Sequence, residues 1–146
     1  MDFDCECLQP ADDYVAGEGK CYFSMEPEEH CMNYYKQATF NNAIMASCPN
    51  HSFFKKIIDY IFYESRYVYT GGRITDVHAT TGPIMLTKLY KNYLCKDKIV
   101  LWSAELASPW SQTEVRSVMN GTADEAYLEK KLEKAFAIHY FFSLWT

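Results

Sequence analysis

The chain has 146 residues, of which 49% are hydrophobic, 16% aromatic and 23% charged, and this composition predicts one globular domain and excludes a disordered or collagen-like chain. The net charge of −5, with no basic block, argues against nucleic-acid binding through phosphate neutralisation. No apolar run is long enough to cross a bilayer, and the acidic start at residues 1–4 does not fit a signal peptide. The six cysteines contain no C-x-x-C pair, so reduced thiols are expected.

The first half of the chain predicts a loop, a strand and a helix. Breakers such as Pro10, Gly17 and Gly19 indicate a loop over 8–20, and residues 21–25 form a short strand candidate followed by a polar loop over 26–30. A compact apolar stretch over 40–47 surrounds two asparagines. Ser52 is the expected N-cap of an amphipathic helix, because apolar residues recur at helical spacing over 53–62.

The second half adds two helices and a strand. A turn is expected at 71–72, and Gly82-Pro83 predicts a helix start because proline suits the first helical position. Residues 98–102 are expected to form a strand. Thr122 and Glu125 have the spacing of a capping box, which predicts a third helix. Alternating strands and helices indicate an α/β layer architecture.

Two carboxylates stand at the start, in Asp2-Phe3-Asp4. On an extended strand, side chains at i and i+2 share a face, so Asp2 and Asp4 are expected to hold a hard divalent cation together. Such a cation screens the charge of a diphosphate leaving group. The alternative is an acidic terminus in solvent. On the same strand, Cys5 and Cys7 are expected to share the opposite face as core residues.

Other polar residues have both a functional and a structural interpretation. Gly82 and Pro83 combine close backbone approach with free helix amides that favour anions or hydroxyls, or they form an ordinary helix start. Asn42 suits a sugar hydroxyl, or a turn contact. His78 beside Asp76 is interpreted as a surface pair at a strand end, and Glu26 either faces the site or lies in a solvated loop.

Four segments, taken in order, resemble motifs of glycosyltransferase family 32, the mannosyltransferase and capsular-polysaccharide group. The segments are 2–13 (DFDCECLQPADD), 40–54 (FNNAIMASCPNHSFF), 79–83 (ATTGP) and 137–145 (AIHYFFSLW). They are similar to the family's D-x-D-x-x-x-L-x-P-x-D, N-x-x-x-x-A…H-P-F, T-G-P and H…S-W patterns. Ser52 stands where the family usually has proline, and the usual Gly-Ser-Trp end is replaced by residues 142–145.

The resemblance implies a metal-dependent, retaining glycosyltransferase that moves a hexosyl group from a nucleotide-diphosphate sugar to a hydroxyl of a glycan acceptor, in polysaccharide biosynthesis. It implies an α/β fold of GT-A type and an Mn²⁺ or Mg²⁺ ion. Asp2 and Asp4 match the residues that bind metal and diphosphate. The motifs also imply that the metal site includes His139 and Ser143 and that substrate contacts come from Asn42, Thr81, Gly82, Pro83 and Trp145.

The family's nucleotide-binding half precedes its D-x-D motif, whereas this chain begins at that motif. We therefore expect residues 1–146 to form a single domain that resembles the C-terminal half of a glycosyltransferase catalytic domain. A fragment of a longer enzyme, a second polypeptide that supplies the first half, and a non-catalytic interaction module with a degenerate transferase fold remain alternatives. A cytoplasmic location, with or without membrane association, is expected.

Overall fold

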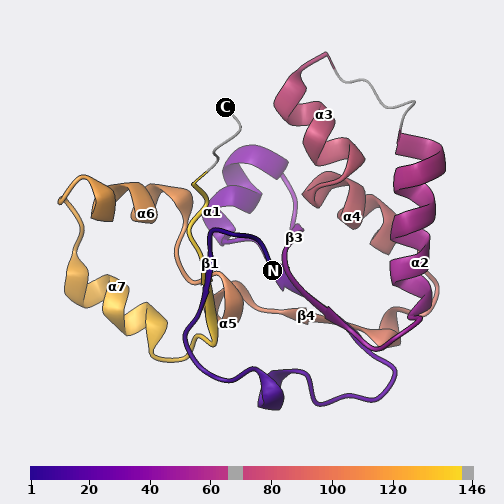
Figure 1. Ribbon diagram of the computed structural model, residues 1–146. Helices are drawn as coiled ribbons and strands as arrows, with labels where there is room; N and C mark the ends of the chain where they lie inside the picture. Colours follow the sequence, from indigo (N-terminus) through magenta and orange to yellow (C-terminus); the bar gives the residue numbers. More distant parts are fainter. Residues whose placement is uncertain (66–70, 143–146) are drawn as a thin grey trace.

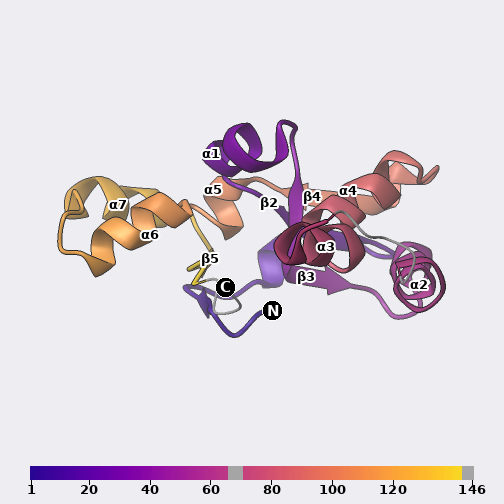
Figure 2. The ribbon, with the colours of Figure 1, turned by 90° about the horizontal axis from the view of Figure 1, so that it is seen from above.

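The computed structural model describes residues 1–65 and 71–142, which form a mixed α/β structure with two small sheets. Figures 1 and 2 show the larger sheet in the middle, with one group of helices on either side of it. Among the described residues, no helix combines the length and the apolar character that crossing a membrane requires.

The larger sheet has the strand order β3 (Phe40–Ser47), β2 (Cys21–Met25), β4 (Ile99–Trp102). β2 pairs antiparallel with β3 and parallel with β4, so the chain between β3 and β4 crosses over the sheet through helices. Both expected strands, over 21–25 and 98–102, are confirmed, the second with a start one residue later. The register of β2 and β3 shifts between Phe23 and Met25, which marks a bulge next to the cavity described below.

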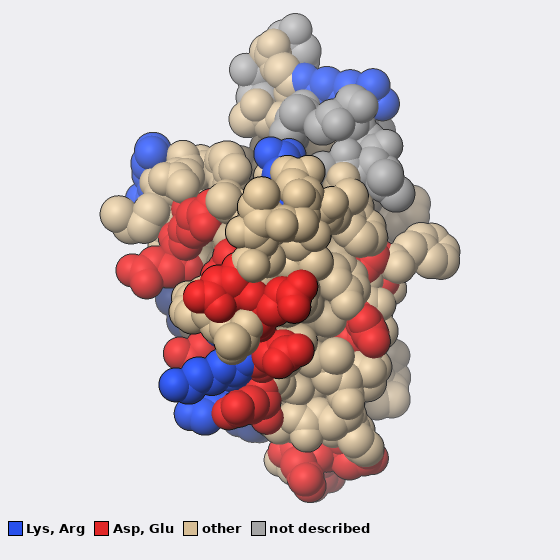
Figure 3. All heavy atoms as spheres, turned by 90° about the vertical axis from the view of Figure 1, so that its left-hand side faces the viewer, with Lys and Arg blue, Asp and Glu red and all other residues tan. Residues whose placement is uncertain are grey.

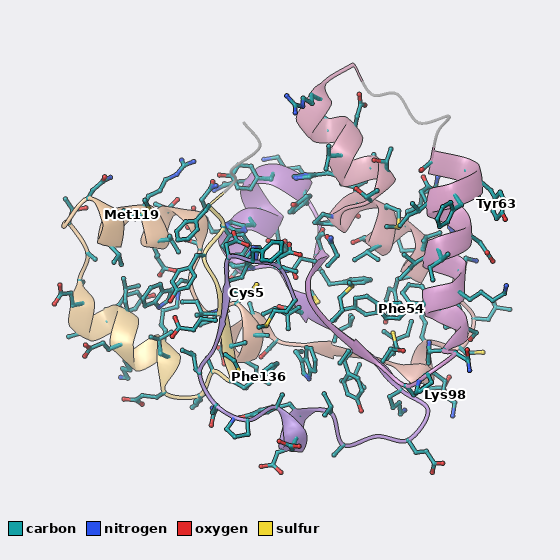
Figure 4. The ribbon with its side chains drawn as sticks, viewed as in Figure 1. Cys5, Phe54, Tyr63, Lys98, Met119 and Phe136 are labelled. Carbon is teal, nitrogen blue, oxygen red and sulfur yellow. The ribbon has the colours of Figure 1, made fainter. Side chains whose placement is uncertain are left out.

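One face of this sheet packs against α2 (Ser52–Asp59) and α4 (Pro83–Lys91). Phe23 is fully buried there, with its ring perpendicular to that of Phe53 at 5.6 Å and stacked on that of Phe54 at 5.8 Å. In Figure 4, Phe54 lies between α2 and the sheet, whereas Tyr63 points outward. Within the apolar repeat over 53–62, Phe53 and Ile57 are buried, whereas Ile58 and Phe62 are 50% and 70% exposed, so only one side of the repeat is core.

The expected start of α4 is confirmed, with Gly82 as N-cap and Pro83 as the first helical residue. The expected N-cap of α2 is wrong by one residue: His51 caps the helix, and its Nδ1 accepts a hydrogen bond from the Phe53 amide at 3.2 Å. A π-helical segment, Tyr60–Glu64, continues α2.

Residues 73–80 form α3 (Arg73–Thr80), so the interpretation of His78 and Asp76 as a pair at a strand end is wrong. The residues expected as a polar loop instead begin α1 (Glu28–His30), which continues as the π-helical segment Cys31–Tyr35. Neither segment shows a continuous apolar stripe in the sequence, and the structure places one polar residue of each, His30 and His78, against the same cavity.

The helices on the other side of the sheet are α5 (Ala104–Ala107), α6 (Gln112–Met119) and α7 (Glu125–Leu132). The expected capping box at Thr122 is wrong, because the N-cap of α7 is Asp124, whose carboxylate accepts from the Tyr127 amide. A full capping box occurs at α6 instead, between Ser111 and Glu114. Figure 3 shows this side of the molecule, where acidic side chains gather over the middle of the face.

The smaller sheet joins the two ends of the described chain. β1 (Cys5–Cys7) pairs antiparallel with β5 (Ala137–His139), and Cys5 lies opposite His139. A second cluster of buried apolar residues anchors this sheet to the larger one, through Phe136 against the Trp102 ring. The pairing places the first residues of the chain and residues 139–142 side by side.

Candidate functional site

A cavity of about 410 Å³ lies between the N-terminal turn, α1, the start of β3, the α3–α4 junction, α6 and the residues after β5. In Figure 1 these elements surround the centre of the view. The sequence-predicted site residues that the structure describes all line this one cavity. They are Asp2, Asp4, Asn42, Thr81, Gly82, Pro83 and His139. The tertiary structure therefore brings together residues from four separate segments of the chain.

The two remaining predicted residues, Ser143 and Trp145, lie outside the described part of the chain. Their place in the site stays a prediction.

The local conformation of the acidic motif differs from the expected extended strand. Residues 3 and 4 form a turn, in which the Cys5 amide bonds to the Asp2 carbonyl at 3.3 Å, and β1 begins only at Cys5. Asp2 and Asp4 therefore do not share one strand face, and the expected geometry is wrong. Both still line the cavity, with Asp2 exposed and Asp4 partly buried.

Asp4 is held by the segment that follows β5. Its Oδ1 lies 3.2 Å from His139 Nε2, its Oδ2 accepts from the Phe142 amide at 3.0 Å, and its own carbonyl accepts from the Tyr140 amide at 2.9 Å. These contacts fix the position of the Asp4 carboxylate, although residues 2–4 do not form a strand. They also explain how an acidic motif next to a terminus can be ordered.

The His139 side chain is only 12% exposed, and burial lowers the pKa of its imidazole, although the charge of Asp4 opposes that shift. A neutral imidazole is the form that binds metal ions. The other ring nitrogen, Nδ1, is buried and has no hydrogen-bond partner among the described residues. The ring is thus oriented by its contact with Asp4 rather than by a partner on its far side.

Asp4, Cys5 and His139 present ligand atoms that all lie within 4.8 Å of one another. The thiol is the weakest of the three, because burial and the charges of Asp4 and Asp2 raise the pKa of Cys5 to about 12. This position also corrects the expectation that Cys5 faces away from the aspartates. Carboxylate and neutral imidazole are both ligand types that divalent metal ions accept, and Asp2 lines the same cavity without being one of the three clustered residues.

The opposite wall carries a buried pair that the sequence motifs did not reveal. Glu26 and His30 are 6% and 4% exposed, and His30 Nδ1 lies 2.7 Å from Glu26 Oε2. Of the two alternatives for Glu26, the structure supports the one in which it faces the site. The i, i+4 spacing of an acid and a histidine was the available signal, but it is informative only once 28–30 is known to be helical.

The α3–α4 junction forms a third wall. A Cβ on Gly82 would lie 2.9 Å from the His78 Cα, so glycine is required for the close approach of the two helices. His78 itself lines the cavity and packs against the Tyr35 ring at 5.8 Å. Burial lowers the pKa of His78, while the charge of Glu26 opposes that change.

Residues after β5 connect the two sides of the cavity. Phe141 has a left-handed backbone with φ of 51°, which is unusual for an aromatic residue and is found where neighbouring contacts enforce it. Its ring lies 3.9 Å from that of His139 and 4.5 Å from that of His30. Arg116 of α6 adds a guanidinium to the same lining.

Comparison of the chain with protein-family models, with curated proteins and with solved structures gave no match.

Proposed function

We propose that this chain is a metal-dependent glycosyltransferase with a GT-A-like fold, which transfers a hexosyl group from a nucleotide-diphosphate sugar to a glycan hydroxyl. The observation that carries the proposal is the convergence of Asp2, Asp4, His139 and the Thr81-Gly82-Pro83 junction on one cavity. These residues come from separate segments of the chain, 2–4, 81–83 and 139.

Asp4 and His139, with Asp2, would hold an Mn²⁺ or Mg²⁺ ion, which when bound supplies positive charge against the leaving diphosphate. The protein's own contribution begins with orientation, because the Phe142 and Tyr140 amides fix Asp4. The free amides at the start of α4 lie at the same cavity, where they favour anionic or hydroxyl groups of the substrate. The residues after β5 line the same cavity, where they would limit the access of water.

A retaining reaction of the front-face kind needs no protein nucleophile. The bond between the sugar carbon and the diphosphate oxygen breaks, the acceptor oxygen bonds to that carbon on the same face, and the acceptor proton passes to the departing phosphate oxygen. The proposal keeps polysaccharide biosynthesis in the cytoplasm as the expected setting.

The test is binding of UDP and GDP by calorimetry, with and without Mn²⁺. Metal-dependent binding in the wild type, lost in Asp4→Asn and retained in the matched surface variant Asp13→Asn, supports the proposal. If binding of UDP and GDP does not depend on Mn²⁺, or if Asp4→Asn leaves that binding unchanged, the proposal is contradicted. In that case the non-catalytic interaction module becomes the better interpretation.

A further inference from the structure

The Glu26–His30 pair has one defined protonation pattern, set by a backbone contact. The amide N–H of Gln112, at the start of α6, donates to His30 Nε2 at 2.9 Å. That nitrogen therefore carries no proton, so Nδ1 carries it and donates to Glu26 Oε2 at 2.7 Å. His30 thus donates to Glu26 through Nδ1 and accepts from the Gln112 amide through Nε2, and the two bonds orient the Glu26 carboxylate.

The second carboxylate oxygen of Glu26 is available to the cavity. Glu26 lines the cavity, and Oε1 has no hydrogen-bond partner among the described residues, 1–65 and 71–142. Glu26 is 6% exposed, and its Oε1 is not among the fully buried unpaired side-chain atoms, so this oxygen can be reached from the cavity. A ligand that donates a hydrogen bond to Oε1 would complete its pairing.

Asn41 presents the complementary group from the neighbouring strand. It is 2% exposed and lines the same cavity; its Oδ1 accepts from the Ala43 amide at 3.1 Å, while its Nδ2 is buried without a partner among the described residues. Met25 pairs with Phe40 and the Glu26 amide bonds to the Thr39 carbonyl, so Glu26 lies opposite Thr39, and Asn41 is two residues further along β3. The two side chains are therefore diagonal neighbours on one face, with Cα atoms about 7–8 Å apart, a spacing that long side chains can bridge.

We infer that Glu26 Oε1 and Asn41 Nδ2 form a subsite for one hydroxyl group of a sugar ring, an inference that rests on the proposed function. A hydroxyl donates one hydrogen bond and accepts others, so it satisfies an anionic acceptor and an amide donor together. The charge of Glu26 disfavours phosphate here, which separates this subsite from the aspartates that would hold the metal. Tyr34, Tyr35 and Phe141 in the lining add aromatic surface for the C–H face of the ring.

The test compares a sugar nucleotide with the corresponding nucleoside diphosphate. Calorimetry with Mn²⁺ measures UDP against UDP-glucose and UDP-galactose, and GDP against GDP-mannose, so the affinity ratio isolates the contribution of the sugar. Glu26→Gln keeps an oxygen for His30 and removes the anionic acceptor, and we expect it to reduce the ratio for the best donor about tenfold, as for loss of a charge-assisted hydrogen bond. Glu28→Gln, the same change at an exposed residue two positions on, is the matched control.

Asn41→Asp is the second variant, because it keeps the oxygen that Ala43 needs and removes the donor toward the cavity. Asn33→Asp, at an exposed position, controls for the added charge. Thermal unfolding of each variant establishes that it is folded. An assigned side-chain amide resonance of Asn41 that shifts with the sugar nucleotide, but not with the nucleoside diphosphate, is a direct readout independent of the variants.

The variants also separate the two sources of the hydroxyl. A reduced ratio assigns the subsite to the donor sugar. An unchanged ratio with a roughly tenfold higher KM for p-nitrophenyl hexoside acceptors assigns it to the acceptor, and both outcomes support the subsite. Unchanged donor ratio and unchanged acceptor KM in Glu26→Gln overturn it while the proposed function stands. Absence of Mn²⁺-dependent UDP or GDP binding in the wild type overturns both.

Discussion

Asp4 and His139 come from opposite ends of the described chain, yet Asp4 Oδ1 and His139 Nε2 are 3.2 Å apart. The β1–β5 pairing sets this distance, because Cys5 lies directly opposite His139. Residues 139–142 thereby hold the acidic motif in place, and the same segment brings Phe141 against His30 on the far wall. The candidate metal ligands and the Glu26–His30 pair thus share one structural support.

Binding of Mn²⁺ should stabilise the folded protein. Because the ion binds the native state, the melting temperature should rise with Mn²⁺ concentration, and the rise should be lost in His139→Asn, which removes one candidate ligand. Differential scanning fluorimetry against a chelator-treated sample measures the shift. His51→Asn, a histidine outside the cavity, serves as the comparison; an equal rise in His139→Asn and wild type would exclude His139 as a ligand.

Gly82→Ala should destabilise the protein by about 1–3 kcal/mol, since the added methyl group would lie 2.9 Å from the His78 Cα and backbone atoms cannot yield as a flexible side chain does. Urea unfolding gives the free energy. Gly72→Ala is the control, because its new Cβ would meet only the Thr75 hydroxyl at 3.4 Å. Equal stability of the two variants would show that the α3–α4 contact is looser than described.

The two capping interpretations of α7 differ in a measurable way. Asp124→Ala removes the side chain that accepts from the Tyr127 amide and should cost about 0.5–2 kcal/mol in the free energy of unfolding. Thr122→Ala removes only a hydrogen bond to the Ser117 carbonyl on the exposed surface and should cost less. Chemical denaturation of both variants decides the order, and a larger loss in Thr122→Ala would restore the sequence-based capping box.

Stability should fall as the pH drops through the range where histidine titrates. Burial lowers the pKa of His78 below its ordinary value of 6.5, so below that pH the unfolded chain binds a proton that the folded chain resists. Burial shifts His139 in the same direction. Unfolding free energies at about pH 7.5 and about pH 5.5 should differ less in His78→Gln than in the wild type. An equal difference in both proteins would show that other groups cause the pH dependence.

The local sequence pattern is sufficient to predict a segment's structure where that structure depends on the segment's own residues. The strand over 21–25 has a compact run of apolar residues, and Pro83 after Gly82 fixes a helix start by its own backbone restriction. The ordered motifs also predicted residues that prove to share a cavity, from Asp2 to His139. Each motif can be recognised from a few neighbouring residues, so the sequence indicates these positions without giving their arrangement in space.

The sequence-based predictions are wrong where a long-range contact competes with the local sequence pattern. His51 rather than Ser52 caps α2, and Asp124 rather than Thr122 caps α7, because the path of the entering chain decides which side chain reaches the free amides. The turn at Asp2–Asp4 forms because the amides of residues 140 and 142 donate hydrogen bonds to Asp4. A prediction from residues 2–4 alone cannot include these distant donors.

By itself, the sequence determined the mixed α/β class, the central strands and which motif residues to examine, since these depend on residue type and short-range spacing. Only the tertiary structure decided that Glu26, His30 and Asn41 share the cavity with Asp4 and His139. The physical reason is that a buried polar group acquires its role from the partners that folding places around it, and those partners come from β5, α6 and the neighbouring strand.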